Sequence, residues 1–316
     1  MNDTTRGTLQ MTAAMTISGT IGWFVVVSGA AVVDVVFWRC LFGAATLALV
    51  CAAKGLLRRD AITRRQLAFA ALGGVAIVAN WLLLFAAYPR ASISIATAVY
   101  NTQPFMLVGL GALVLRERPT AAKLAWLVVA FAGMLMIVQS APGTDAHGAD
   151  YLGGIALALG AALLYAIAAI VAKHLNGVRP HLIALIQVTV GSMLLAPLVH
   201  WHALPTQATT WALLGTLGVV HTGIMYILLY GAIQKLPTSL TGTLSFIYPI
   251  VAIAVDAFAF GHRLDAWQYL GAGAILIAAA GMTLGASWRL QAPARGRVHT
   301  ERTDAQPRRA RECASH

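Results

Sequence analysis

The sequence predicts an all-α integral membrane protein with ten transmembrane helices, arranged as two inverted five-helix repeats around a central cavity. Three observations carry this prediction. Only 10% of the 316 residues are charged, against roughly 25% in soluble domains, and 59% are hydrophobic. The segments between successive groups of charged residues have the ~17–25 residue length of a membrane-spanning helix. The second half of the chain also repeats features of the first half.

Charged residues delimit the first five spans, which are predicted at residues 9–29, 35–53, 66–87, 92–114 and 121–138. Arg6 precedes the first span, and the basic cluster from Lys54 to Arg65 separates the second span from the third. Arg90 follows the third span. The charged segment 115–120 contains a proline, so it is the loop between the fourth and fifth spans. Each span is long enough to cross a ~30 Å hydrocarbon core as a helix.

The second five spans are predicted at residues 151–172, 181–199, 209–232, 238–260 and 266–288. Lys173 and Arg179 lie in the loop between the first two of them. The charge-free stretch between Arg179 and Lys235 is too long for one helix, and the polar segment 200–205 divides it into two spans. The apolar runs are continuous and do not alternate, which favours helices over the strands of a membrane barrel.

The two sets of five spans coincide at a shift of 145 residues without gaps. Matching positions at this shift include residues 81–87 with 226–232, Arg90 with Lys235, Ser94 with Ser239, Pro104 with Pro249 and Arg118 with Arg263. Because five is an odd number, the two halves must cross the membrane in opposite directions. Such inverted repeats are typical of secondary transporters. The predicted regions are a first repeat at 1–144, a second at 145–288 and a cytoplasmic tail at 289–316.

The positive charges are distributed unequally between the two sides of the membrane. With the N-terminus inside, nineteen of the 22 Lys and Arg residues lie on the inner side, and Arg90 and Arg263 lie on the outer side. Because Lys and Arg are retained in the cytoplasm, both termini are predicted to be cytoplasmic, in a bacterial-type inner membrane. The tail 289–316 carries seven of the arginines and is predicted to be disordered and attracted to anionic lipid, not to nucleic acid.

Two prolines near the middles of the fourth and ninth spans indicate the centre of the protein. A proline lacks an amide donor and disrupts the hydrogen bond to the carbonyl four residues earlier. Within hydrocarbon, the freed carbonyls of Tyr100 and Ser245 are tolerated only where protein or a water-filled cavity satisfies them. The candidate cavity residues here are Pro104, Pro249, Tyr100, Asn101, Gln103, Ser245 and Tyr248. The alternative is a pair of packing kinks with locally satisfied side chains.

Trp81 and Tyr226 occupy matching positions in the two repeats, with Asn80 and His221 nearby. Ring faces with a few convergent donors suit a small organic substrate, although such rings also serve as interfacial belts. His221 is an ionisable group near the middle of a span, which makes it a functional candidate. A neutral histidine that hydrogen-bonds a neighbouring helix is the alternative.

Arg39 lies about one turn inside the outer end of the second span. Its fork of donors could contact a substrate carboxylate. Two alternatives remain open at this point: the side chain could extend to the membrane surface, or it could pair with Asp34.

Absent motifs narrow the function classes. The spans contain no H-E-x-x-H, no G-x-S-x-G and no paired aspartates, so no enzyme activity, cofactor or metal site is predicted. A channel would need rings of like residues around a pore, and none is visible. Arg39 alone is too little for a phosphorylated solute, and no carboxylate lies at mid-membrane depth for a lipophilic cation. A transporter of a neutral or zwitterionic solute remains, with a membrane receptor or scaffold as the non-transport alternative.

These features together resemble the drug/metabolite transporter superfamily, and within it the ten-helix carriers built from two EamA-type repeats. The residues that carry the resemblance are Phe37-Trp38-Arg39, the Pro104 helix ending in Leu115-Arg116-Glu117-Arg118-Pro119-Thr120, and the degenerate copy Phe260-Gly261-His262-Arg263-Leu264-Asp265. The likeness covers about residues 7–288. In the second copy His262 replaces the acidic residue at Glu117, a departure from the family pattern.

The resemblance implies a basket of helices around a central cavity and efflux of small metabolites from the cytoplasm. The sequence looks most like the exporters of amino acids, aromatic or bulky apolar ones in particular. Export of drugs or other organic metabolites is the alternative. The expected partners are a small-molecule substrate and membrane lipid. The oligomeric state is left open, with a monomer as the simplest arrangement.

Overall fold

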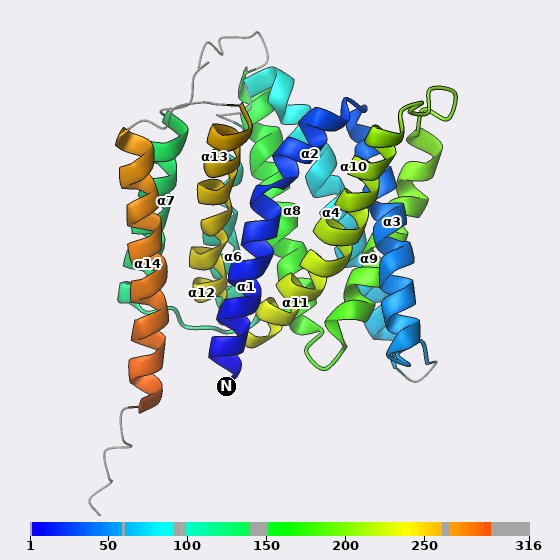
Figure 1. The fold of residues 1–316 in the computed structure, drawn as a ribbon. Coiled ribbons are helices and arrows are strands. Elements are labelled where there is room, and N and C mark those ends of the chain that lie inside the picture. Colours follow the sequence, from blue (N-terminus) through cyan, green and yellow to red (C-terminus); the bar gives the residue numbers. More distant parts are fainter. Residues whose placement is uncertain are drawn as a thin grey trace, which may run out of the picture.

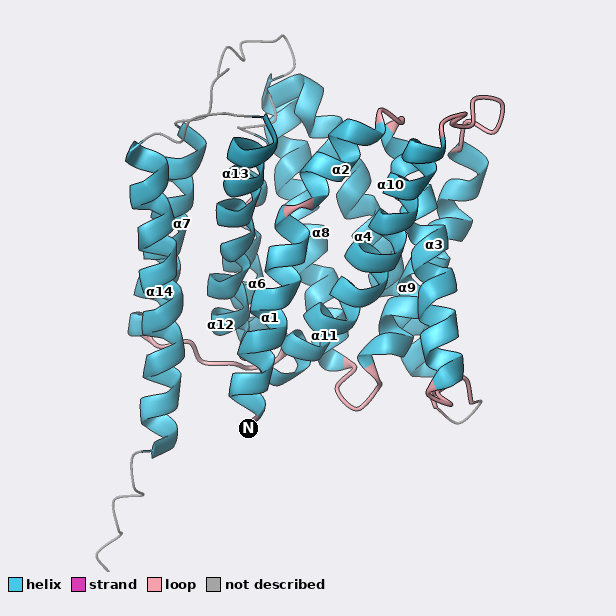
Figure 2. Cartoon of the chain, viewed as in Figure 1, coloured by secondary structure: helices cyan, strands magenta, loops and turns pink. Residues whose placement is uncertain are grey.

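The structure is a computed structural model, and it describes residues 2–58, 61–91, 96, 99–139, 151–260 and 266–291. Every regular element in these residues is a helix, as Figure 2 shows. The predicted all-α class is therefore confirmed. The tail beyond residue 291, Ser94 and the segment 261–265 with Arg263 lie outside the described residues.

The first half of the chain forms α1 (Asp3–Gly19), α2 (Ile21–Ser28), α3 (Val32–Ala53), α4 (Arg64–Ala91), α6 (Gln103–Val114) and α7 (Ala121–Gln139). The second half forms α8 (Tyr151–His174), α9 (Pro180–Leu195), the short 3-10 helix η1 (Ala196–Leu198), α10 (Ala208–Gly218), the π-helix η2 (Val219–Ile224), α11 (Met225–Lys235), α12 (Thr238–Ser245), α13 (Ile247–Phe260) and α14 (Ala266–Gln291).

These elements account for the ten predicted spans. Five stretches of the described chain are each long and apolar enough to cross a membrane alone: Val32–Ala53, Arg64–Ala87, Tyr151–His174, Pro180–Leu198 and Ala208–Lys235. The described ends of the chain, at α1 and α14, lie at the same end of the bundle in Figure 1, as an even number of spans requires. Large apolar side chains such as Leu113 and Phe258, which are 80% and 91% exposed, face outward where lipid is the solvent.

The fourth and ninth spans are broken next to their prolines. Gln103 and Pro104 begin α6 after a turn at residues 101–102. Likewise α12 ends at Ser245, and Pro249 lies in the first turn of α13. A proline at a helix start loses no hydrogen bond, because the first amides of a helix have no partner within it. Each proline therefore marks the start of a second helical segment instead of a kink inside one helix.

Two further irregularities carry no proline. The first span is divided at Thr20, whose hydroxyl donates to the carbonyl oxygen of Ile17. The eighth span changes from α-helix to π-helix over Val219–Ile224 and back again. The two irregular segments are in contact, because the Thr20 hydroxyl lies 2.7 Å from Nε2 of His221 in η2.

Helix packing follows the inverted repeat. The third span of the first half (α4) packs along the first span of the second half (α8), and the exchanged pair, α11 and α1, packs in the same way. The pair α6 and α8 has its counterpart in α13 and α1. The helices α3 and α9 pack against each other, as do α7 and α14. The last two pairs each join corresponding spans, and the earlier pairs occur in exchanged form, as expected for repeats related by a pseudo-two-fold axis.

Close helix approach depends on glycine at two interfaces. A Cβ atom on Gly43 of α3 would lie 2.6 Å from the Thr222 side chain. On the rim of the bundle, a Cβ atom on Gly133 of α7 would lie 2.6 Å from the carbonyl oxygen of Gly271 in α14. Small residues let membrane helices pack backbone to backbone in this way.

Candidate functional site: a tyrosine-lined cavity beside a buried arginine

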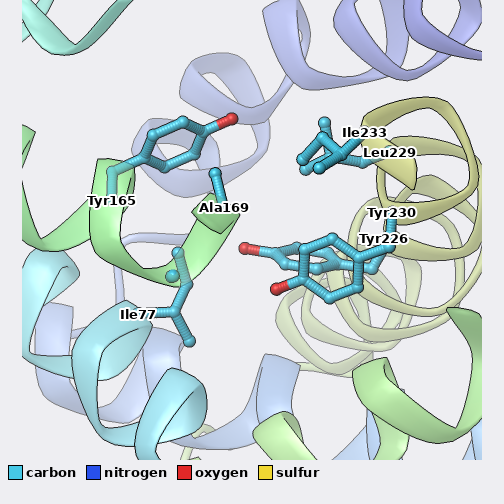
Figure 3. A pocket seen from close by; sticks show the side chains of 8 residues that line it. Ile77, Tyr165, Ala169, Tyr226, Leu229, Tyr230 and Ile233 are labelled. Carbon is cyan, nitrogen blue, oxygen red and sulfur yellow. The ribbon is translucent and has the colours of Figure 1, made fainter. Parts of the chain in front are cut away.

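A small cavity lies between α4, α8 and α11 in the middle of the bundle (Figure 3). Its volume is about 10 Å³, room for roughly one water molecule. Its lining consists of Ile77 from α4, Tyr165, Ala168 and Ala169 from α8, and Tyr226, Leu229, Tyr230 and Ile233 from α11. This volume is far below the ~300–1,000 Å³ of typical small-molecule sites, so the binding of any organic solute would require the helices to separate.

Three tyrosine hydroxyls are the polar groups of this cavity. Those of Tyr226 and Tyr230 point from α11 toward α4 and α8, and that of Tyr165 points back from α8 (Figure 3). Tyr230 donates its hydroxyl to Oε1 of the buried Gln187 on α9. The rings of Tyr226 and Tyr230 meet edge to face with centroids 5.2 Å apart, which fixes their orientation.

Trp81 connects the cavity to Arg39. The Trp81 ring meets Tyr226 edge to face at a centroid distance of 6.2 Å. On the Trp81 ring lies the guanidinium of Arg39, with Cζ 4.3 Å from the centroid. A cation over an indole face gains ~2 kcal/mol or more when water is excluded. Predicted site residues from the second, third and eighth spans therefore meet at one place.

Arg39 is buried and lacks a countercharge among the described residues. Its exposed fraction is 3%, so it does not extend to the membrane surface. Asp34 instead pairs with His200, with 3.1 Å between Oδ2 and Nδ1. The Arg39 Nε donates to Thr222 Oγ1 at 3.2 Å, and Nη2 has no described hydrogen-bond partner. The structure thus excludes both alternative roles considered for this arginine.

The π-helix positions the acceptor for Arg39. In η2 the Thr222 hydroxyl donates to the carbonyl oxygen of Leu217 at 3.0 Å, five residues earlier, and the Thr222 oxygen faces Arg39. His221 Nδ1 lies 3.4 Å from the carbonyl oxygen of Thr216, also five residues earlier. Both side chains thus contact carbonyl oxygens in the α-helical turn that precedes η2. Single π-helical turns often occur at functional sites.

His221 lies outside the cavity lining and links two irregular helix segments. Its Nε2 atom is 2.7 Å from the Thr20 hydroxyl, at the break between α1 and α2, and its ring packs on Phe24 with centroids 4.7 Å apart. The side chain is buried and bonded to a neighbouring helix. This is the arrangement foreseen as the alternative to a direct functional role.

The residues around the two prolines form hydrogen-bonded pairs near the cavity and are not part of its lining. Asn80 Nδ2 donates to the Tyr100 hydroxyl at 3.4 Å and to the carbonyl oxygen of Ala161 at 2.6 Å. The Tyr100 ring contacts Tyr165 of the lining at a centroid distance of 6.3 Å. Asn101 Nδ2 likewise donates to the Tyr248 hydroxyl at 3.3 Å, across the two repeats.

The remaining candidates of this group are packing residues in the described conformation. Ser245 donates its hydroxyl to the carbonyl oxygen of Thr241. Pro104 packs against α12 where Gly242 leaves room. Pro249 and Gln103 are buried, and Gln103 Oε1 has no described partner.

Sequence reasoning missed Tyr165, Tyr230 and Thr222. Tyr230 follows Tyr226 by four residues and so shares its helix face, a signal that was present. Tyr165 lies deep within a predicted span, away from the interfaces where aromatic belts occur. Thr222 had no comparable signal, because its role depends on a π-helix.

Comparison with known proteins identifies the family of this chain. The model of the EamA-like transporter family matches residues 5–139 and 152–284. An uncharacterized transporter of Bacillus subtilis, YxxF, is 28% identical over 277 residues, which is 87% of this chain and 88% of that protein. The threonine/homoserine exporter RhtA of Escherichia coli is 28% identical over 220 residues, 67% of this chain and 69% of the exporter.

A solved crystal structure supports the fold independently. It is 18% identical in sequence and superposes with a TM-score of 0.79, covering 90% of this chain and 98% of its own. At this level of identity the match concerns the fold alone.

Proposed function

We propose that this chain, which belongs to the EamA-like transporter family, exports small neutral or zwitterionic metabolites, amino acids in particular. The proposed mechanism is alternating access. Transport is the family's shared activity. Two antiparallel copies around one cavity can adopt two related arrangements, each open to one side of the membrane. The solute class follows from the site.

The buried guanidinium of Arg39 is the observation that carries the amino-acid proposal. An uncompensated charge inside a membrane protein is costly and usually functional. The Trp81 ring contacts one face of this guanidinium, and Thr222 accepts a hydrogen bond from its Nε. Its Nη2 has no described hydrogen-bond partner. A carboxylate is the ligand that matches the remaining donors in charge and geometry. The solute therefore carries a carboxylate and binds beside Trp81.

The cavity wall suggests the rest of the solute. The rings of Tyr165, Tyr226 and Tyr230 offer apolar faces and hydroxyls, which suit an aromatic or bulky apolar side chain. The small volume favours a second candidate, a small hydroxyl-bearing amino acid, because it would require less separation of the helices than a bulky one. The name of the relative RhtA, a threonine/homoserine exporter, points to the same candidate.

Counterflow in liposomes that contain the purified protein tests the proposal. Labelled Phe, Trp, Leu and Thr are compared with a cationic dye and with the amides of the same amino acids, with and without a pH gradient. We expect exchange of at least one amino acid and no exchange of its amide, which lacks the carboxylate. Exchange of the dye alone, or equal exchange of acid and amide, would contradict the proposal.

The proposed location is a bacterial-type inner membrane with both termini in the cytoplasm. The excess of Lys and Arg at the end of the bundle that carries the N-terminus supports this orientation. An alkaline phosphatase fusion at the C-terminus should be inactive and a green fluorescent protein fusion should be fluorescent. The reverse pattern would place that terminus in the periplasm and contradict the orientation.

A further inference from the structure

A polar network joins the two repeats at the end of the bundle that carries the N-terminus. Lys173 Nζ at the end of α8 lies 3.2 Å from Oε1 of Glu117, in the loop after α6. The other carboxylate oxygen of Glu117 accepts from the backbone amide and the hydroxyl of Thr238, at 2.9 and 2.7 Å. Lys173 also donates to the carbonyl oxygen of Leu236, just after α11. One ion pair thus connects four helix ends.

The network keeps Glu117 charged. Burial alone would raise the pKa of Glu117, but the hydrogen bonds from Thr238 and the charge of Lys173 outweigh it and hold the pKa below its ordinary value. The side chains of Lys173 and Glu117 are only 15% and 23% exposed, so water screens their attraction weakly. Glu117 also accepts from the first amide of α12, where the helix dipole favours a negative charge.

This network lies directly beneath the cavity. Ala169, which lines the cavity, precedes Lys173 by one turn of α8. Ile233 lines the cavity as well, and its carbonyl oxygen accepts from Lys173 Nζ at 3.4 Å. Opening the cavity toward this end requires the first-repeat segment with Glu117 to separate from the second-repeat helix ends. That separation breaks the ion pair and uncaps α12.

The positions that correspond to Glu117 and Lys173 at the opposite end of the bundle carry no acid–base pair in the sequence. At the repeat shift of 145 residues, Lys173 corresponds to Ser28 and Glu117 to His262. The hydroxyl of Ser28 donates to the carbonyl oxygen of Val25 within its own helix. His262 lies outside the described residues, but by sequence the pair serine and histidine cannot form an acid–base ion pair. The charges of Glu117 and Lys173 are therefore not repeated at the positions related to them by the pseudo-two-fold symmetry.

We propose that Glu117, Lys173 and Thr238 form a latch that favours the conformation closed at the N-terminal end of the bundle. Without it, two similar repeats would differ little in the energies of their two exchanged arrangements. The latch gives this closed arrangement an ion pair and a helix cap that the corresponding positions at the other end do not repeat. The inference concerns the gate and does not depend on the identity of the solute.

Cysteine labelling in reconstituted vesicles tests the latch. The native cysteines Cys40, Cys51 and Cys313 are replaced by alanine, and Ala169→Cys supplies a reporter in the cavity wall. A membrane-impermeant thiol reagent is added from the side of the N-terminus. We expect Glu117→Gln and Lys173→Met each to raise the labelling rate about tenfold, as expected for loss of a charged hydrogen bond. The matched control, Arg118→Gln on an exposed position of the same loop, should leave the rate unchanged.

Labelling from the opposite side separates a shifted equilibrium from simple loosening. The latch requires that the same two substitutions lower the labelling rate from that side. An increase from both sides would show local unfolding, and no change from the N-terminal side would show that the network does not control access; either result overturns the proposal. The double substitution should raise the rate by less than the product of the two single effects. A full product would mean that the residues act separately, which also overturns it.

Discussion

Arg39→Met should lower kcat/KM for carboxylate-bearing solutes by about a hundredfold, the scale expected when one partner of a buried charged contact is removed. The same substitution should leave the unfolding temperature in detergent unchanged or higher. Methionine fills a similar volume and contacts the Trp81 ring, and it removes a buried charge whose Nη2 has no described partner. Counterflow and thermal unfolding of the same preparation measure the two effects together.

Thr222 provides a graded companion to this substitution. Thr222→Val removes the acceptor of Arg39 Nε at nearly constant volume, so the guanidinium is less well oriented. We expect KM to rise roughly tenfold with kcat little changed, while Thr222→Ser should retain wild-type values. If Arg39→Met lowered the stability but not the transport rate, Arg39 would be a structural residue and not a substrate-binding one.

Gly133→Val should lower the free energy of unfolding by about 3 kcal/mol, at the upper end of the usual cost of overpacking. The new side chain would begin 2.6 Å from the carbonyl oxygen of Gly271, and a backbone atom cannot move aside as a flexible side chain can. α7 and α14 would therefore have to separate along their common interface. Thermal unfolding of the purified protein, followed by size-exclusion chromatography, measures the loss.

A matched control lies on the same interface helix. Gly273 is two residues from Gly271 on α14, and a Cβ atom there meets nothing within 4 Å. Gly273→Val should change stability by less than about 0.5 kcal/mol, as is usual for sites without close neighbours. Equal losses in the two variants would mean that glycine is needed for some reason other than the close approach of α7 and α14.

The fold could be predicted largely because the bilayer imposes strong constraints. Charged residues such as Lys54 and Arg90 cannot lie inside hydrocarbon without cost, so their spacing marks the helix ends. Pro104 and Pro249 indicated the two broken spans, because a proline lacks the amide hydrogen that a continuous helix needs.

The breaks at Thr20 and in η2 could not be predicted in the same way. Thr20 and Thr222 divert backbone carbonyls with their hydroxyls, and a threonine in a membrane span more often does so without changing the helix. The ion pair of Glu117 with Lys173 joins residues 56 positions apart in different repeats. Only the packing of α6 on α8 brings them together, and no local pattern encodes that contact.

The candidate site shows the same division. Arg39 was recognised because a cation inside a predicted span is conspicuous, and Trp81 and Tyr226 because they occupy matching positions in the two repeats. Their mutual arrangement, with the guanidinium on the indole face, depends on the angle between α3 and α4 and on the η2 geometry. Composition carries no information about either.

The buried position of Arg39 leads us to expect that membrane voltage affects the proposed transport cycle. Moving one elementary charge across a potential of 100 mV changes the free energy by ~2.3 kcal/mol. Any rearrangement that displaces Arg39 along the membrane normal moves its charge through this field, even when the cargo has no net charge. We therefore expect the rate of the proposed cycle to depend on the potential, and the protein without solute to give brief capacitive currents when it changes conformation.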